Sequence, residues 1–193
     1  VPNTLSADQL SLDLPVRFKL GFNCWLVNLV DHDPSKGFKD YRCQDHGYDG
    51  HTGTDIAIRD WEAIWEGVSV VASAPGRIKA LRDGMLDEVP SADFQEKSKK
   101  RFCGNGVVIA HANDWETQYC HLRRNSTVVK LGQEVGRGAH LGLVGHSGNT
   151  VFPHIHFSVR YQGRVIDPFV GVGNISSCNI GSSPLWTSSA LQE

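Results

Sequence analysis

Short runs of β-branched and other apolar residues, separated by glycines and turn residues, dominate the chain between residues 50 and 170. Runs of this length and composition predict β-strands rather than helices. The predicted strands cover residues 68–72, 76–81, 107–111, 117–122, 141–144 and 156–161. No helix of ordinary length is predicted. This spacing favours an antiparallel β-sandwich or barrel over a βαβ fold.

Two polar segments interrupt the strand pattern. Residues 83–101 are rich in charged side chains and form an insertion, which is either a plain solvated loop or a functional one. Residues 91–100 within it could form a short helix. Residues 174–193 are rich in Ser, Asn and Gly, and we expect a peripheral tail. Residues 112–115 (Ala-Asn-Asp-Trp) predict a tight hairpin turn between two strands.

Composition and charge narrow the class of protein. The chain has 193 residues, 40% of them hydrophobic and 21% charged, which suits one domain with a sizeable core. The formal net charge is −2 and no long basic run occurs, so a nucleic-acid partner is not expected. No stretch of 18 consecutive apolar residues predicts a membrane span. The chain starts at Val1 without a visible signal peptide, as expected of a processed mature form or a trimmed one.

The cysteine spacing favours disulfides over a thiolate metal site. The cysteines lie at 24, 43, 103, 120 and 178, and none forms a Cys-x-x-Cys pair. Cys24 with Cys43 and Cys103 with Cys120 are plausible disulfides, which leaves Cys178 over. Disulfides of this kind favour an oxidising compartment.

Two histidines stand in the middle of residues 151–160, an apolar run that leads into the last predicted strand. His154 and His156 are two residues apart, so their side chains point to the same face of an extended chain. Two imidazoles side by side either need separate partners or share one, and a shared partner is usually a metal ion. The alternative is that both are hydrogen-bonded polar groups without a function on a half-buried strand.

A second cluster supplies further ligand types. His51 and Asp55 are four residues apart, and the glycines at 50 and 53 argue against a helix, so the segment is expected to be extended. It then offers an imidazole and a carboxylate toward one point. With one imidazole of the later strand, the set becomes two nitrogens and one oxygen. That is the ligand mix of a catalytic zinc with an open fourth position.

With these residues the chain resembles a known family, the lysostaphin/LytM-type zinc metallopeptidases, which cut peptide bonds in bacterial peptidoglycan. The resemblance covers about residues 47–170 and rests on several motifs in matching order. These motifs are His51-Thr-Gly-Thr-Asp55-Ile-Ala, Gly106-Val-Val-Ile-Ala-His111, Thr117-Gln-Tyr119-Cys-His121-Leu, Gly132-Gln-Glu-Val135, Leu141-Gly-Leu-Val-Gly-His-Ser-Gly148, Pro153-His154-Ile-His156-Phe and Ile166-Asp167-Pro168.

The resemblance implies a division of labour among five residues. His51, Asp55 and His156 would hold one zinc ion per chain, while His121 and His154 would act beside the open position without binding the metal. The implied reaction is hydrolysis of peptide bonds in peptidoglycan stem peptides or cross-bridges, with a zinc-activated water attacking the scissile carbonyl. Which of the two histidines is the general base stays open.

The resemblance also implies an architecture and a location. Together with the strand pattern it predicts an all-β fold, an antiparallel β-sandwich or half-barrel with the zinc site in a groove. Residues 47–173 would form the metallopeptidase domain, including the insertion at 83–101, with an extension (1–46) packed on it and a tail (174–193). The protein would be periplasmic or secreted, with peptidoglycan peptides as substrate.

Two departures and two other functions have to be weighed. The family commonly has Gly and Glu where this chain has Phe152 and Ser158, which affects the surroundings of the site, and the insertion at 83–101 could wall the groove.

One alternative function is a secreted zinc protease that also cuts glycine-rich proteins. Another is a non-catalytic cell-wall binder or amidase activator, although such relatives usually lack some ligands. His111 is expected to be structural, and His146 is a weaker candidate for the groove.

Overall fold

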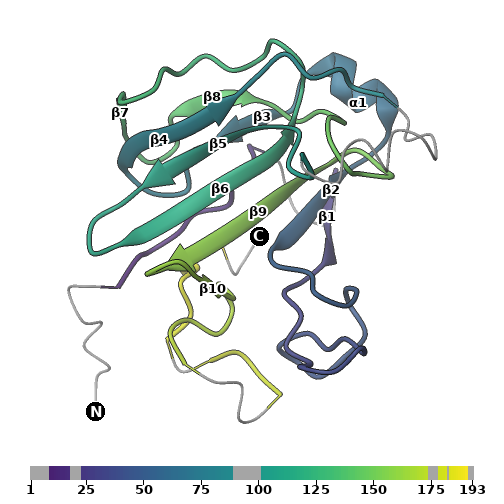
Figure 1. Cartoon of the computed structure of the whole chain (residues 1–193), viewed down its shortest axis with the longest axis vertical. Helices are drawn as coiled ribbons and strands as arrows, with labels where there is room; N and C mark the ends of the chain where they lie inside the picture. The colour runs from purple at the N-terminus through teal and green to yellow at the C-terminus, as the bar shows by residue number, and fades with distance from the viewer. Residues whose placement is uncertain (1–8, 18–22, 89–100, 174–177, 182, 191–193) are drawn as a thin grey trace.

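The computed structural model describes residues 9–17, 23–88, 101–173, 178–181 and 183–190. Regular structure in these residues is almost entirely β (Figure 1). The strands are β1 (Cys24–Asn28), β2 (Thr54–Ile58), β3 (Ser69–Val71), β4 (Gly76–Arg82), β5 (Asn105–Ala110), β6 (Trp115–Leu122), β7 (Glu134–Val135), β8 (His140–Leu143), β9 (His154–Tyr161) and β10 (Arg164–Ile166). The helix α1 spans Trp61–Glu66.

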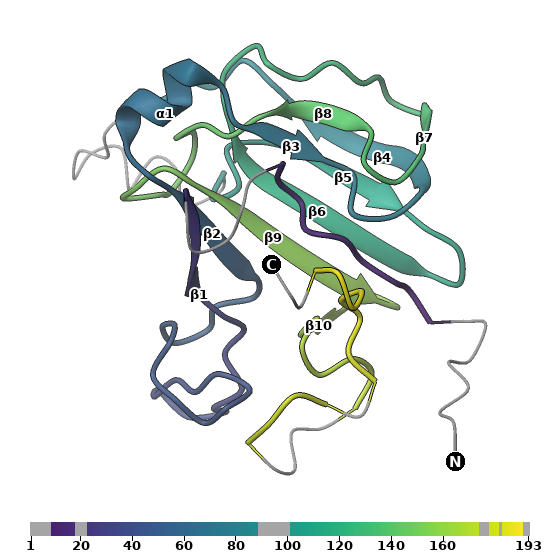
Figure 2. The same cartoon turned by 180° about the vertical axis from the view of Figure 1, so that it is seen from behind.

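The strands form one large sheet and one small sheet. The large sheet has eight strands in the order β1-β2-β9-β6-β5-β4-β7, with β10 paired to β9, and the small sheet pairs β3 with β8. All pairings between these strands are antiparallel. The prediction of an antiparallel all-β fold is therefore confirmed. The small sheet lies against part of one face of the large one, as Figure 2 shows from behind.

The alternation of side chains along β9 separates the core from the site. Ile155, Phe157 and Val159 are at most 1% exposed and belong to the hydrophobic core. Because successive side chains of a strand point to opposite faces, the residues between them point to the other face of the sheet. Residues of the small sheet, such as Val70 and Leu141, contribute to the same core. The face of the large sheet that does not pack on this core carries the histidines of β9.

The six strands predicted from the apolar pattern correspond to β3, β4, β5, β6, β8 and β9. The predicted hairpin turn is also present, since Asn113 and Asp114 have φ values of 56° and 61°, as a two-residue type I′ turn requires. The pattern missed β1, β7 and β10, and it missed the six-residue α1, which Asp60 caps by accepting a hydrogen bond from the Ala63 amide. The helix predicted at 91–100 lies outside the described residues.

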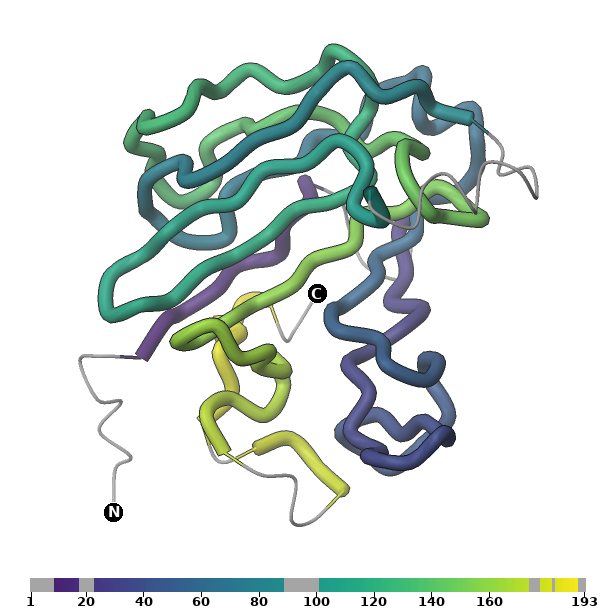
Figure 3. The backbone as a smooth tube through the Cα atoms, viewed as in Figure 1, coloured from purple at the N-terminus to yellow at the C-terminus, as the bar shows by residue number. Residues whose placement is uncertain are grey.

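One of the two expected disulfides is wrong. Cys103 is bonded to Cys120 as predicted, but Cys43 is bonded to Cys178 rather than to Cys24. Cys24 lies in β1 opposite Ile58 and is fully buried in the core. Cys43 instead lies in the long loop between β1 and β2, which projects beyond the sheet in Figure 3. The disulfide ties this loop to the C-terminal segment.

Both ends of the described chain contribute to the core. Leu12, Leu14 and Val16 are buried, and Leu12 forms a parallel β-bridge with Trp186 near the C-terminus. The segments before β1 and after β10 therefore pack on the sheets. The described part of the chain contains no helix long and apolar enough to cross a membrane.

Candidate functional site

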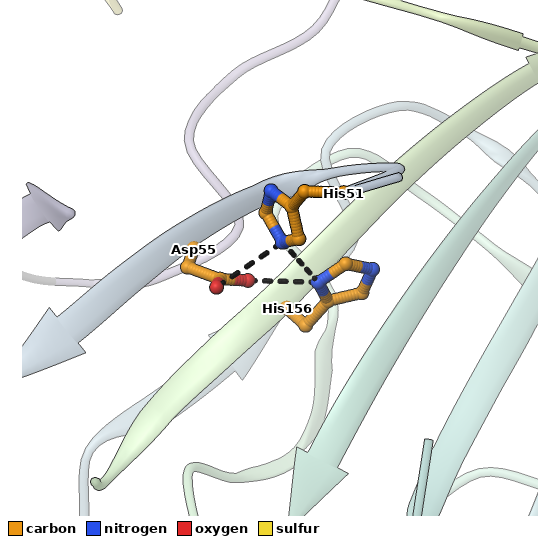
Figure 4. A group of neighbouring side chains, drawn as sticks. All are labelled: His51, Asp55 and His156. Atoms are coloured by element: carbon orange, nitrogen blue, oxygen red, sulfur yellow. Dashed lines mark hydrogen bonds and ion pairs between the residues drawn. The ribbon is translucent and has the colours of Figure 1, made fainter. Parts of the chain in front are cut away.

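Neighbouring strands bring His51, Asp55 and His156 together. β2 and β9 pair so that Asp55 lies directly opposite His156, and His51 precedes β2 by three residues. The three side chains point toward one another, with one possible ligand atom from each lying within 4.8 Å of the other two (Figure 4). His51 Nε2 is 3.2 Å from Asp55 Oδ2 and 3.1 Å from His156 Nδ1, which is 2.7 Å from Asp55 Oδ1. This is the cluster that the two sequence patterns predict.

The orientation of both imidazoles fits a metal ion. His51 Nδ1 donates a hydrogen bond to the Leu29 carbonyl at 2.7 Å, which leaves the lone pair on Nε2 to face the cluster. His156 turns Nδ1 to the cluster and Nε2 to the Ser158 hydroxyl at 2.9 Å. Tetrahedral zinc with bonds of about 2.0–2.1 Å separates its ligand atoms by about 3.3–3.4 Å. The three distances observed are slightly shorter, so a small outward shift accommodates the ion.

Asp55 is the centre of negative charge in the cluster. The residue is 2% exposed, and burial alone would raise the pKa of the carboxyl group. Hydrogen bonds from His156 and His51 outweigh burial and hold the pKa well below its ordinary value. Asn28 also donates a hydrogen bond to Asp55 Oδ2 at 2.8 Å. A buried carboxylate between two imidazoles attracts positive charge, either a proton or a metal ion.

The pKa of His51 depends on the same carboxylate. Burial alone would lower the pKa of His51, but the hydrogen bond to Asp55 and the charge of Asp55 raise it overall. Two imidazole nitrogens that face each other at 3.1 Å cannot both present lone pairs without repulsion unless a cation lies between them. A proton on one of the two nitrogens, or a metal ion bound by both, removes this repulsion.

His154 and His121 lie beside the cluster. His154 Nδ1 donates to the Phe152 carbonyl at 2.8 Å, and His121 Nδ1 donates to the Ser147 carbonyl at 2.8 Å. The two rings lie 4.7 Å apart between centroids, and His154 Nε2 is 3.5 Å from Asp55 Oδ1. Burial lowers the pKa of both histidines, that of His121 strongly. Both are therefore neutral, with an unprotonated Nε2 available to accept a proton.

A β-bulge turns His121 toward the site. In the pairing of β5 with β6, Gly106 lies opposite Cys120 while Asn105 lies opposite Leu122, so His121 is the extra residue. Its φ is 63°, in the left-handed region that non-glycine residues rarely adopt. In a regular strand Tyr119 and His121 would share a face, and Tyr119 is fully buried in the core. The bulge reverses this for His121.

Ser158 contacts the cluster, and sequence reasoning noted it only as a departure from the family pattern. It is 1% exposed, and its hydroxyl accepts a hydrogen bond from His156 Nε2–H when Nδ1 presents its lone pair to the cluster. Such a bond fixes the tautomer and the ring orientation of a ligand histidine. Phe152, the other departure, contacts His154 in two ways: its backbone carbonyl accepts a hydrogen bond from Nδ1, and its ring packs against the imidazole at 4.5 Å between centroids.

Replacing Ser158 with alanine is expected to weaken zinc binding by about 10–100-fold, the usual effect of losing the partner of a metal-binding histidine. The affinity is measured by competition with a chromophoric chelator. Ser188→Ala, at an exposed position far along the chain, is the matched control. An unchanged affinity in Ser158→Ala would show that the hydroxyl does not orient His156.

A groove runs over the site. Its volume is about 340 Å³, and its lining includes His51, His121 and His156 together with residues farther along β6 and β9. The Cys103–Cys120 disulfide forms part of the wall. Tyr48 lies over the His51 ring at 4.6 Å; burial, with the charge of Asp55, raises the pKa of its phenol to about 12, so the hydroxyl stays protonated. Sequence reasoning did not identify Tyr48.

Most of the insertion at 83–101 lies outside the described residues, so its role as a groove wall stays a prediction. The start of the insertion is fixed, because Asp83 accepts hydrogen bonds from the backbone of residues 125 and 127. Asp87 accepts a hydrogen bond from the amide of His146, one residue before the carbonyl that holds His121. The base of the insertion therefore supports the segment that orients His121.

The other histidines lie apart from the cluster. His111 is structural, as predicted, with its nitrogens hydrogen-bonded to the Pro75 carbonyl and to Thr117. His146, the weaker candidate for the groove, is fully buried and packs on Trp61 at 4.4 Å between ring centroids. It does not line the described groove.

Comparison with known proteins agrees with this geometry. The model of peptidase family M23 matches residues 49–168. The peptidoglycan DD-endopeptidase ShyA of Vibrio cholerae is 41% identical over 66 residues, which are 34% of this chain and 15% of that protein. The DD-carboxypeptidase/endopeptidase Mpg of Neisseria meningitidis is 32% identical over 123 residues, 64% of this chain and 23% of that protein.

A solved structure supports the fold. The catalytic domain of the prophage-encoded M23 protein EnpA from Enterococcus faecalis superposes with a TM-score of 0.54 at 20% identity, over 87% of this chain and all of that one. The matched segments make up only 10–23% of the length of the first curated relatives. The family match itself spans more than half of this chain. The chain belongs to peptidase family M23.

Proposed function

We propose that this protein is a zinc-dependent endopeptidase that hydrolyses peptide bonds in bacterial peptidoglycan. The observation that carries the proposal is the cluster of two imidazole nitrogens and one carboxylate, whose two histidines line the groove, with two neutral imidazoles beside it. The names of the relatives ShyA and Mpg support peptidoglycan as the substrate. A complete residue set argues against a non-catalytic binder.

His51, Asp55 and His156 are the proposed ligands of one zinc ion per chain. Three protein ligands are the number that catalytic zinc sites use, so that a water molecule or substrate can take a further position. When bound, zinc lowers the pKa of water to about 7 and polarises the scissile carbonyl. Ser158, Asn28 and the Leu29 carbonyl hold the three ligand side chains in place.

His154 and His121 are the proposed catalytic residues. Because each Nδ1–H is bound to a backbone carbonyl, Nε2 is the nitrogen that exchanges protons in both rings. One Nε2 accepts the proton of the attacking water, and the resulting imidazolium returns it to the amine that leaves. A protonated Nε2 also donates a hydrogen bond to the oxyanion that develops at the carbonyl. The lowered pKa values keep both rings unprotonated near neutral pH, as a proton acceptor must be.

The proposed location and domain division follow from the substrate and the disulfides. Peptidoglycan lies outside the cytoplasm, and two disulfides suit an oxidising compartment, so we place the protein in the periplasm or among secreted proteins. Residues 47–173 would form the catalytic domain, in agreement with the family match at 49–168. Residues 1–46 would be an extension packed on it, and 174–193 a tail.

Parallel digestion of three substrates tests the substrate class. The substrates are sacculi of the diaminopimelate type, sacculi with pentaglycine bridges, and elastin as a glycine-rich protein. We expect loss of cross-linked fragments from at least one type of sacculus, and the cut bond identifies the specificity. Cleavage of elastin without cleavage of either wall would instead establish the secreted protease. No cleavage by protein with bound zinc would indicate a binding role.

A further inference from the structure

Arg160 extends the site along the floor of the groove. It lies four residues after His156 on β9, and both line the groove with Ser158 between them. Residues at i, i+2 and i+4 of a strand share one face, so these three side chains form a row. Gln118 on β6 lies opposite Ser158 in the pairing and lines the groove beside this row.

The guanidinium of Arg160 has a neutral partner only. Its Nη1 donates to Gln118 Oε1 at 2.7 Å, and no carboxylate in the described residues pairs with it. Glu116 lies opposite Arg160 in the strand pairing, but its carboxylate is bound to Lys79. Most of the five N–H donors of the guanidinium thus stay available. Arg160 is only half-buried, so they can reach a ligand in the groove.

The charge of the groove favours an anion. Among the described residues that line it, Arg160 is the one permanently charged side chain, and none is a carboxylate. Guanidinium groups bind carboxylates through two parallel hydrogen bonds, and a low-dielectric groove strengthens such pairs. Gln118 fixes the guanidinium from one side, which leaves the other edge to a ligand. The arrangement therefore suits a carboxylate.

The spacing places that carboxylate close to the scissile bond. At about 3.3 Å per residue, the backbone of Arg160 lies about 13 Å from the backbone of His156. The backbone of Ser158 lies about 7 Å from that of His156. The hydrogen bond to Gln118 draws the guanidinium toward the level of Ser158. An extended peptide has the same rise per residue, so the distance of about 7 Å to the level of Ser158 corresponds to about two residues, and the reach of the side chains widens this to about one to three.

We propose that Arg160 determines specificity by binding a free carboxylate of the substrate peptide, about one to three residues from the cleaved bond. This inference rests on the proposed function and narrows it to acidic peptides. The enzyme would then distinguish cross-linked peptides with free carboxylates from the same peptides with carboxamides. Uncharged glycyl-glycine bridges would be poor substrates unless a carboxylate lies nearby.

Cleavage of two matched substrates tests the inference. The substrates are a cross-linked peptide dimer purified from diaminopimelate-type sacculi and the same dimer after conversion of its carboxylates to carboxamides. The wild-type protein is expected to show at least tenfold higher kcat/KM on the free carboxylates. Arg160→Gln should reduce this preference to within about twofold and leave cleavage of the carboxamide near the wild-type rate. Arg160→Lys should keep part of the preference.

Control variants and a binding measurement separate the possible failures. Arg164→Gln, at an exposed arginine of β10 outside the groove lining, should keep the full preference. If Arg160→Gln keeps the preference, or loses activity equally on both dimers, the inference is overturned while the proposed function stands. If the wild-type protein cleaves neither dimer, the proposed function fails instead. The affinities of both dimers for the His154→Ala protein, measured by calorimetry, then test whether Arg160 binds a carboxylate. Equal affinities for the two dimers would contradict the inference.

Discussion

Replacing Asp55 with asparagine is expected to remove bound zinc and to lower kcat/KM at least about a thousandfold, which corresponds to about 4 kcal/mol of lost transition-state stabilisation. Asp55 is the only carboxylate of the cluster in the described residues, and both neighbouring imidazoles bond to it. An amide of the same size carries no charge and directs N–H donors at one of these imidazoles. Both effects weaken the binding of a cation.

The measurement is the metal content per chain, by elemental mass spectrometry, together with hydrolysis of sacculi. Asp49→Asn is the matched control, because Asp49 lies in the loop just before β2, is exposed, and has no place in the cluster. It should keep one zinc ion and full activity. If Asp55→Asn protein still held one zinc ion and cleaved sacculi, the proposed ligand set would be wrong.

Replacing His154 with alanine is expected to lower kcat by about 10²–10⁴-fold while the protein keeps its zinc, and the same holds for His121→Ala. Each residue presents an unprotonated Nε2 beside the cluster, and neither Nε2 belongs to the group of ligand atoms. The prediction therefore separates the loss of catalysis from the loss of metal, which the Asp55 variant combines.

Both histidines are buried, so a change in stability has to be distinguished from a change in chemistry. The thermal midpoint of each variant is measured with the zinc content, and Gln replacements serve as a second pair that fills more of the space. His140→Ala, at an exposed position of β8, is the control and should be fully active. Activity near the wild-type level in either His154 or His121 variant would exclude that residue from proton transfer.

The sequence was most informative where one strand alternates between core and site. In β9, buried apolar residues take every second position, which fixes the face on which His154 and His156 lie. The hairpin turn before Trp115 is local as well, since Asn and Asp tolerate the left-handed backbone that it needs. These features depend on residues close together in the chain, so their pattern predicts them.

The features that the sequence left open depend on residues far apart in the chain. His121 reaches the site through a bulge in the register of β5 against β6, and no local pattern of β6 shows it. Asn28 reaches Asp55 because β1 pairs with β2, and β1 has no clear alternation to predict it. The disulfide from Cys43 to Cys178 spans 135 residues. Sequence spacing favoured the nearer Cys24, whose thiol the core buries.

The most direct measurement of the central claim is the release of soluble fragments from purified sacculi before zinc removal, after dialysis against a chelator, and after addition of one equivalent of zinc. Mass spectrometry of the fragments identifies the bond that is cut. We predict cleavage of peptide cross-links by the first sample, none by the second, and recovery in the third. Cleavage that persists in the zinc-free protein, or no cleavage by protein that holds zinc, would contradict the account.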